Sequence, residues 1–404
     1  MAPLSTAEED ALPSELLRQL SQTPYACSSL TQLSGGSANF VYRGILTQPL
    51  ASTSGQKAVE KTVIVKHSTG FLSVNRDFAL DVSRCLLIFA FLSLQTYEEF
   101  MLQALVNFTF TTPATLVRAP RLYLFIRGTN TQVHQDFSDA TDLRAVLRST
   151  PTLDNMLSSQ FPSPISLGRS LGSWLRAFHT WASDPAQAAL QERIGQNEPM
   201  RKLKHLVNYG TFIGILQKFP DIVSIEELKV LHDVKDMADK ELAKKPRDGG
   251  ECFGIIHGDF CMLNVLVSNN SKRKHQEEGE VEKLYIIDWE LAQFGHRAYD
   301  LGHMIGDLYE QKHFNNTESA MPSIRGFVEG YGGLSEELAF RTAIHAGTHL
   351  IGGYNRRPKT GKLAAPEEKI VGMLEVAKDF VVKGWEKDRR WFESSPLAPL
   401  FRDN

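Results

Sequence analysis

The sequence contains little cysteine, and that scarcity excludes a disulfide-stapled fold. Four of the 404 residues are cysteine, at positions 27, 85, 252 and 261. None of them has the CxxC or Cys/His spacing of a metal site. So few thiols in so long a chain favour a reduced, intracellular protein over a secreted one.

The sequence also lacks a segment that predicts membrane insertion or export. Its most apolar run, CLLIFAFLSL at residues 85–94, is about half as long as the roughly 20 residues that a membrane-spanning helix needs. The N-terminal residues MAPLSTAEEDALPSELL include early acidic side chains and neither the basic nor the apolar region of a signal peptide. We therefore expect a cytoplasmic protein without a membrane partner.

Charge of one sign is missing as well. Lysine and arginine number 44 against 47 aspartates and glutamates, a formal net charge of −3, and no basic stripe suggests a nucleic-acid partner. A Lys-Arg-Lys cluster at 272–274 lies in the polar segment 268–282, where a solvated loop explains it better than a localisation signal. The 42% apolar content excludes wholesale disorder, and the length suggests two or three domains.

Apolar periodicity predicts a small β-rich part followed by a larger helical one. The glycine pair in LSGGSANFVYR (33–43) indicates a hairpin with a tight turn, and KTVIVKH (61–67) and RLYLFIR (121–127) indicate strands. Helices are expected over 14–20, 77–107, 165–182, 225–244, 299–312, 322–330, 336–354 and 366–392, and short strands over 253–257, 264–268 and 283–288. The fold class is α+β, with an N-terminal lobe over 1–132, a hinge at 133–137 and a helical lobe over 138–404.

The most informative segment is HGDFCMLNVLV, which begins at His257. It places Asp259 and Asn264 in one loop, and YIIDWE adds Asp288 and Glu290 after the next strand. Phosphoryl transfer needs such a set, because a carboxylate accepts the proton of the attacking hydroxyl, and amide and carboxylate oxygens bind Mg²⁺. HGDxxxxN alone could be a structural turn. The order of glycine loop, strand lysine, HGD loop and Asp-x-Glu nevertheless predicts a kinase-like fold.

In that order the segments resemble the aminoglycoside phosphotransferase/choline kinase superfamily of small-molecule kinases, and within it methylthioribose kinase and the fungal 4-hydroxytryptamine kinases. The resemblance rests on LSGGSANFVYR, VIVKH, VHQDF, HGDFCMLN, IDWELAQFGHRAYDLGHMIGD and AIHAGTHLIGG. It implies a bilobal protein-kinase-like fold, ATP and Mg²⁺ as cofactors, and a small-molecule acceptor such as a sugar, an amino alcohol, an aminoglycoside-like amine or a hydroxyindole. Protein kinases carry DFG and a later APE, which this chain lacks, so a protein substrate is disfavoured.

The resemblance also implies roles for individual residues. Asp259 would be the base, Asn264 and Asp288 would bind Mg²⁺, and Glu290 would be a further metal or substrate contact. Lys66 would pair with the ATP phosphates and with Glu98. Further nucleotide contacts are implied for Gly35, Gly36, Ser37, Asn39, Val133, Gln135 and Asp136. A plain hairpin turn remains the alternative for the glycines, and a non-catalytic nucleotide-binding pseudokinase or scaffold remains the alternative for the whole chain.

Acceptor contacts are implied for His349, Arg356 and Arg357, near the end of a predicted helix. The two arginines could bind an anionic group of the acceptor, or they could simply complement the helix dipole. Asp300 would brace the HGD loop, and His257 is expected to stabilise it by hydrogen bonding. The oligomeric state is left open between monomer and homodimer.

The apolar residues 85–94 stand out as an apparent addition to the helix that carries Glu98. Ten residues at 100° each advance a helix by about 1000°, which is about 80° short of three full turns. A helical insert is therefore expected to turn Glu98 away from Lys66. Three interpretations compete: a buried extension, a loop that leaves the helix register intact, and retained intron sequence. We favour the last two together.

Overall fold

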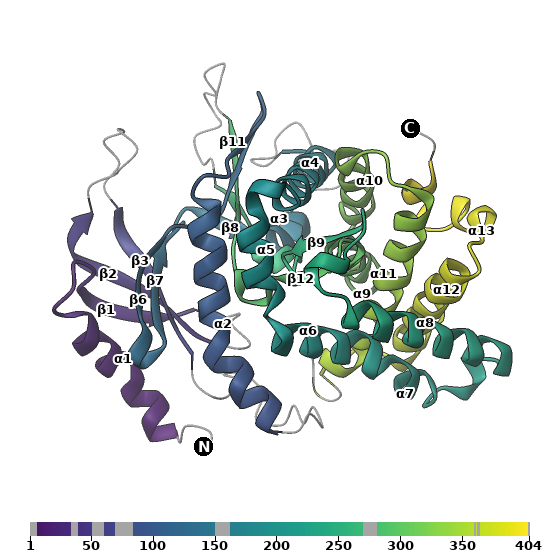
Figure 1. Cartoon of the computed structure of the whole chain (residues 1–404), viewed down its shortest axis with the longest axis horizontal. Coiled ribbons are helices and arrows are strands. Elements are labelled where there is room, and N and C mark those ends of the chain that lie inside the picture. Colours follow the sequence, from purple (N-terminus) through teal and green to yellow (C-terminus); the bar gives the residue numbers. More distant parts are fainter. Residues whose placement is uncertain are drawn as a thin grey trace. The chain divides into compact units, whose positions relative to one another are not determined.

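The computed structural model describes residues 6–33, 39–50, 60–68, 84–149, 162–269, 281–358, 361 and 364–402 (Figure 1). They form two compact units, one within residues 1–108 and 118–140 and the other within 109–117 and 141–404. A sheet dominates the first unit and helices dominate the second, so the predicted α+β class is confirmed. No helix in the described part of the chain has the length and apolar character needed to span a membrane.

The first unit is an antiparallel sheet with two helices. Its strands follow the order β1-β2-β3-β7-β6. The elements are α1 (Thr6–Leu20), β1 (Cys27–Gln32), β2 (Phe40–Leu50), β3 (Glu60–His67), α2 (Arg84–Leu105), β6 (Leu122–Ile126) and β7 (Thr131–Gln135). The expected hairpin is confirmed by the pairing of β1 with β2, whereas its turn at 34–38 lies outside the described residues.

The two described helices of this unit cover opposite faces of the sheet. Successive side chains of a strand point to opposite faces, so neighbouring residues of β3 contact different helices. Leu12, Leu16 and Leu20 of α1 pack in one cluster with Val65 and other residues of the sheet. The next residue, Lys66, points to the other face and contacts α2. This alternation is what places a charged lysine beside a helix while its neighbours form an apolar core.

Helix α2 corrects the expectation about residues 85–94. The helix runs unbroken from Arg84 to Leu105, so these residues do not leave it as a loop, and Glu98 still contacts Lys66. The buried residues Gln95, Glu98, Leu102 and Leu105 share one face of the helix and orient it. The face that these four residues bury sets the rotation of the helix at Glu98, whatever number of residues precedes it.

The second unit contains two small sheets and most of the helices. Its sheets have the orders β4-β5-β11-β10-β8 and β12-β9. The strands are β4 (Phe110–Thr111), β5 (Thr115–Arg118), β8 (Ala140–Asp142), β9 (Phe253–Ile256), β10 (Val265–Ser268), β11 (Glu282–Ile286) and β12 (Gln293–His296). The helices are α3 (Leu143–Ser149), α4 (Pro164–Ala182), α5 (Ala188–Gly195), α6 (Glu198–His205), α7 (Phe212–Leu216), α8 (Ile225–Ala243), α9 (Ala298–Asn315), α10 (Ala320–Tyr331), α11 (Glu336–Arg356), α12 (Glu367–Trp385) and α13 (Arg389–Glu393).

Helices α4 and α10 pack closely against each other in the second unit. Added Cβ atoms at Gly168 and Gly172 of α4 would overlap backbone carbonyls of α10, and those at Gly326 and Gly330 of α10 would overlap carbonyls of α4. Glycine at these positions therefore lets the two backbones approach each other directly. The long helix predicted over 366–392 is instead two helices, because Lys387 adopts a left-handed conformation (φ 55°) and Asp388 caps α13.

Candidate active site

The HGD loop, residues 257–264, connects the two small sheets of the second unit. It leaves β9, which pairs with β12, and it enters β10, which pairs with β11. Gly258 has φ 82°, and a Cβ atom there would overlap the carbonyl oxygen of Leu291. Only glycine meets both conditions without strain, which explains why the residue between His257 and Asp259 has no side chain.

Asp300 in the first turn of α9 holds the start of this loop. Its fully buried carboxylate accepts hydrogen bonds from the backbone N–H groups of His257 (2.8 Å) and Gly258 (2.9 Å). A third bond joins it to Nε2 of His179 (3.1 Å), whose Nδ1 lies 3.0 Å from the Tyr331 hydroxyl. Burial alone would raise the pKa of Asp300, but the hydrogen bond and charge of His179 outweigh it and lower the pKa. This geometry is the bracing role expected for Asp300.

Asp307, two turns further along α9, holds the other end of the loop. It accepts a hydrogen bond from the backbone N–H of Met262 (2.9 Å) and pairs with Arg144 at 3.1 Å. Burial raises the pKa of its carboxyl group. Sequence reasoning missed this residue. The available signal was the seven-residue spacing from Asp300, which places both aspartates on one face of a helix.

His257 stabilises the loop from inside. Its ring is fully buried, with Nε2 lying 3.0 Å from the carbonyl oxygen of Ile287 and Nδ1 accepting from the backbone N–H of Asp259 at 3.3 Å. Burial lowers the pKa of this histidine, so the imidazole is neutral and serves as a hydrogen-bonding strut. The ring leaves no nitrogen over for proton transfer.

Asp259 and Asn264 face each other across the loop. The Nδ2 group of Asn264 donates to the backbone oxygen of Asp259 (2.9 Å) and to its carboxylate Oδ2 (3.1 Å). These two bonds orient the amide so that its oxygen points away from Asp259. The Asp259 side chain keeps 32% of its surface exposed, so a hydroxyl group can approach its carboxylate from solvent.

Asp288 and Glu290 follow β11 in a turn that packing holds in place. Backbone pairing of β10 with β11 continues through a bond from Ile287 N–H to the carbonyl of Asn264 (3.0 Å), which brings the Asp288 turn beside Asn264. Asp288 has φ 65°, a left-handed conformation that aspartate and asparagine adopt more readily than most non-glycine residues. Between the two carboxylates, Trp289 is fully buried and packs on His257 with ring centroids 4.5 Å apart.

These residues fit a hard divalent cation. The set consists of one amide oxygen and carboxylate oxygens, the donor chemistry that Mg²⁺ prefers. The orientation of the Asn264 amide is the structural test, because both of its N–H groups are used by Asp259 and only its oxygen is directed elsewhere. Asn264, Asp288 and Glu290 are therefore the residues that would hold the metal.

In the first unit Lys66 and Glu98 form the buried ion pair that the family resemblance implied. The Lys66 ammonium lies 2.9 Å from the Glu98 carboxylate, with side chains 8% and 3% exposed. Gln132 Nε2 donates to the carbonyl of Gln95 (2.8 Å) one turn earlier in α2 and fixes the rotation of the helix. Such a pair holds a lysine extended as a point charge for phosphate oxygens.

The other residues predicted to contact the nucleotide are only partly described. Gly35, Gly36 and Ser37 lie outside the described residues, and the buried Asn39 accepts a hydrogen bond from Ser68. Val133 lies in the middle of β7 and pairs with strands on both sides. Gln135 and Asp136, which follow in the sequence, form contacts with other residues. Gln135 donates its backbone N–H to the carbonyl of Arg121 (2.8 Å), and the Asp136 carboxylate pairs with Arg43 at 2.7 Å.

Of the three residues predicted to contact the acceptor, the structure brings His349 and Arg356 together, and Arg357 contacts other residues. Arg356 donates to the carbonyl oxygen of His349 (3.0 Å), whereas Arg357 pairs with Glu310 and lies 3.3 Å over the ring of Phe314. The two arginines therefore do not form a joint anion clamp.

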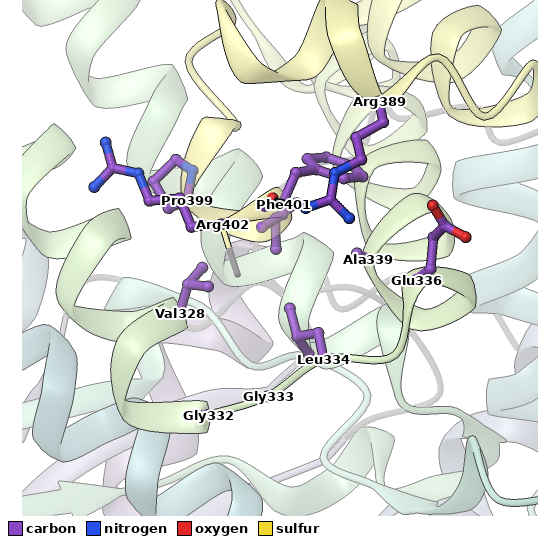
Figure 2. Close-up of a pocket in the computed structure, with 11 residues that line it drawn as sticks. Val328, Gly332, Gly333, Leu334, Glu336, Ala339, Arg389, Pro399, Phe401 and Arg402 are labelled. Atoms are coloured by element: carbon purple, nitrogen blue, oxygen red, sulfur yellow. Dashed lines mark hydrogen bonds between the residues drawn. The ribbon is translucent and has the colours of Figure 1, made fainter. Parts of the chain in front are cut away.

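A cavity of about 300 Å³ lies elsewhere in the second unit (Figure 2). Its walls come from the end of α10, the start of α11 and the C-terminal residues 399–402. Arg389 crosses it and donates to the carbonyl of Phe401 (2.8 Å). None of its lining residues belongs to the HGD loop or to the Asp288 turn.

Comparisons with known proteins show what this chain is similar to. The profile of the phosphotransferase enzyme family matches residues 113–340. Phosphotransferase FrzJ from Cladobotryum sp is 32% identical over 396 residues, which cover 98% of this chain and 97% of that protein. A 4-hydroxytryptamine kinase from Psilocybe cubensis is 21% identical over 85% of each chain. A choline/ethanolamine kinase family protein from Mesorhizobium loti aligns with a TM-score of 0.45 and 11% identity, covering 96% of this chain and 98% of that chain.

Proposed function

The chain belongs to the phosphotransferase enzyme family, and from that premise we propose that it transfers the γ-phosphoryl group of ATP to a hydroxyl group of a small molecule. Family membership confirms the predicted enzyme class. The nucleotide, the metal and the small-molecule acceptor are the finer part of the proposal, and the arrangement of the site residues supports them.

One observation carries the proposal. Asn264 bonds the Asp259 carboxylate through its side chain and the Asp288 turn through its backbone. Two hydrogen bonds at the open end of the β10–β11 hairpin therefore link the base, Asn264 and the residue before Asp288. Phosphoryl transfer depends mainly on positioning and on neutralising charge, and this hairpin supplies both without large rearrangement.

In the proposed reaction each of these residues has a separate role. Asp259 accepts the proton of the acceptor hydroxyl as its oxygen forms a bond to the γ-phosphorus, while the bond to the bridging oxygen breaks and ADP leaves. Asn264, Asp288 and Glu290 would hold the metal, which would supply positive charge to neutralise the phosphates. Lys66, extended by Glu98, pairs with phosphate oxygens. Asp300 and Asp307 keep the loop rigid while the proton moves.

The test is a thermal-shift titration with Mg²⁺ and ATP on the wild type and on Asp288→Asn. A site filled at about 100 times its Kd adds about 2.7 kcal/mol of stability, so the wild type is expected to melt several degrees higher with both ligands than with either alone. Asp288→Asn removes a carboxylate ligand and is expected to lose most of the metal-dependent part of the shift.

Asp236→Asn is the matched control, because Asp236 is an exposed aspartate of α8 in the same unit and its replacement should leave the shift unchanged. A shift in the wild type without consumption of ATP for any hydroxyl acceptor would favour the pseudokinase alternative. No shift at millimolar nucleotide would contradict the proposal.

A further inference from the structure

Lys204 is a buried cation beside the base, and no motif in the sequence pointed to it. It lies in the last turn of α6, with only 6% of its side chain exposed. Its ammonium lies 3.7 Å from Oδ1 of Asp259, on the opposite side from Asn264, which bonds Oδ2. Burying an ammonium group is costly unless it is paired. The partners of Lys204 are a neutral ring nitrogen of His303 at 2.8 Å and one carboxylate at 3.7 Å, which is long for an ion pair.

The segment after Lys204 is unusual in its backbone as well. A π-helical turn spans residues 206–210, and Asn208 donates to the carbonyl of Lys204 (2.9 Å). Turns of this kind occur frequently at functional sites. The local backbone therefore departs from regular helix next to the residue whose burial needs an explanation.

A line of polar side chains leads from Lys204 towards the end of α11. Its ammonium lies 2.8 Å from Nδ1 of His303, and the rings of His303 and His349 are 4.1 Å apart. Arg356 then binds His349 through its carbonyl oxygen (3.0 Å) and lies 3.3 Å from its Nε2. Burial, together with the neighbouring cations Lys204 and Arg356, holds the pKa of both histidines well below the usual value. Both rings are therefore held towards their neutral form. Burial also lowers the pKa of Lys204 while the Asp259 carboxylate raises it, so Lys204 and Arg356 are the basic groups of this line.

The other carboxylates near these side chains accept hydrogen bonds from, or form ion pairs with, other residues. Asp300 bonds the start of the HGD loop, Asp307 bonds Met262 and pairs with Arg144, and Glu310 pairs with Arg357. Among the described residues, Asp259 is the one carboxylate paired with Lys204, and Arg356 has no carboxylate partner. Neither Lys204 nor Arg356 therefore forms a close ion pair with a carboxylate among the described residues, and both have N–H groups that can donate to a ligand.

We propose that Lys204 and Arg356 select an acceptor that carries an oxyanion, a carboxylate or a phosphate ester, close to the hydroxyl that Asp259 deprotonates. The reaction itself rests on the function proposed above, but the selection is a statement about binding. A cationic acceptor such as an amino alcohol would meet the charges of Lys204 and Arg356 beside the base, whereas an oxyanion would accept hydrogen bonds from both. Charge-assisted hydrogen bonds are the stronger class and are sensitive to loss of either partner.

Binding is measured by calorimetry on the full chain with Mg²⁺ and a non-hydrolysable ATP analogue present. Two series each hold the skeleton constant: glycerate, glycerol phosphate, glyceramide and aminopropanediol in one, and phloretate, phloretamide and tyramine in the other. In at least one series the anionic member is expected to bind at least about tenfold more tightly than its neutral or cationic counterpart. The glycerate and glycerol phosphate arms distinguish a carboxylate from a phosphate ester.

The variants assign the preference to the named side chains. Lys204→Met keeps the apolar stem without the charge and is expected to weaken binding of the anion about ten- to hundredfold, with little effect on the neutral amide. Arg356→Gln is expected to act in the same direction, and because Arg356 is exposed this variant keeps the test valid if Lys204→Met fails to fold. Lys204→Arg should restore most of the preference. Lys202→Met, which removes an exposed lysine of the same helix, should change nothing.

Two results would overturn the selection: anions that bind no more tightly than the amides and amines in both series, or a preference that survives both Lys204→Met and Arg356→Gln. ADP release is followed separately with ATP. Selective anion binding without ADP release would leave the selection intact and count against the proposed reaction. ADP release with amines alone would support the reaction and overturn the selection.

Discussion

Replacing Asp259 by asparagine is expected to lower kcat by about 10²–10⁴-fold, the usual contribution of a general base. The amide has the shape of the carboxylate and can still accept the hydrogen bond from Asn264, so the loop should keep its conformation. It cannot take up the proton of the acceptor hydroxyl. The measurement is ADP release at saturating nucleotide, combined with the thermal shift produced by Mg²⁺ and ATP, which should remain.

The surface variant Asp236→Asn is again the control for Asp259→Asn, and it should retain wild-type turnover. If Asp259→Asn stayed within a few-fold of the wild type, the proton would have to go elsewhere and the assigned mechanism would be wrong. Loss of both turnover and the nucleotide shift would instead indicate a disrupted loop, since Asp259 itself is not placed among the metal ligands.

Asp300→Ala is expected to have the largest effect on stability. The substitution leaves the backbone N–H groups of His257 and Gly258 and the ring of His179 without their buried acceptor. Breaking a buried, hydrogen-bonded charge in this way costs about 3–5 kcal/mol. For a unit of this size we expect the melting temperature to fall by about 10 °C, measured by calorimetry or circular dichroism, with activity lost because the HGD loop is released.

The pH dependence gives a second readout on the same carboxylate. The pKa of Asp300 is lower in the folded state than its usual value, so its stabilising contribution is complete above the unfolded pKa of about 4 and is lost as the pH falls through the folded pKa. The stability gap between wild type and Asp300→Ala should therefore narrow in acid. Asp236→Ala should melt with the wild type at neutral pH. A gap that stayed constant from neutral pH into acid would contradict the role given to this carboxylate.

Residues missed from the sequence share a physical cause. Lys204 and Asp307 lie on helices and act on a loop that is remote in the sequence. A basic residue in an amphipathic helix is usually solvated, so nothing in the spacing distinguishes Lys204 from Lys202. The rotation of α6 within the packed unit makes that distinction, because it buries one lysine and exposes the other.

The same reason explains the two acceptor-side arginines and helix α2. Helix α11 ends at Arg356, and Arg357 has an extended backbone (φ −82°, ψ 143°). The two side chains therefore contact different residues, His349 and Glu310 respectively. In α2, the face formed by the buried Gln95, Leu102 and Leu105 determines the direction of Glu98. A count of inserted residues could not reveal this, because it assumed that the helix was anchored before the insert.

The sequence alone determined the chemistry of this protein and the local frame that carries it. The residues HGDxxxxN and Asp-x-Glu lie in and beside short β-branched runs, so the pairing of β10 with β11 and the proximity of Asp259, Asn264 and Asp288 follow from local spacing. Only the tertiary structure decided which distant side chains contact the HGD loop. Asp300 and Asp307 accept hydrogen bonds from its backbone, and the ammonium of Lys204 lies beside Asp259. Local spacing controls neighbours within a hairpin, whereas contacts between distant helices depend on how whole faces pack together.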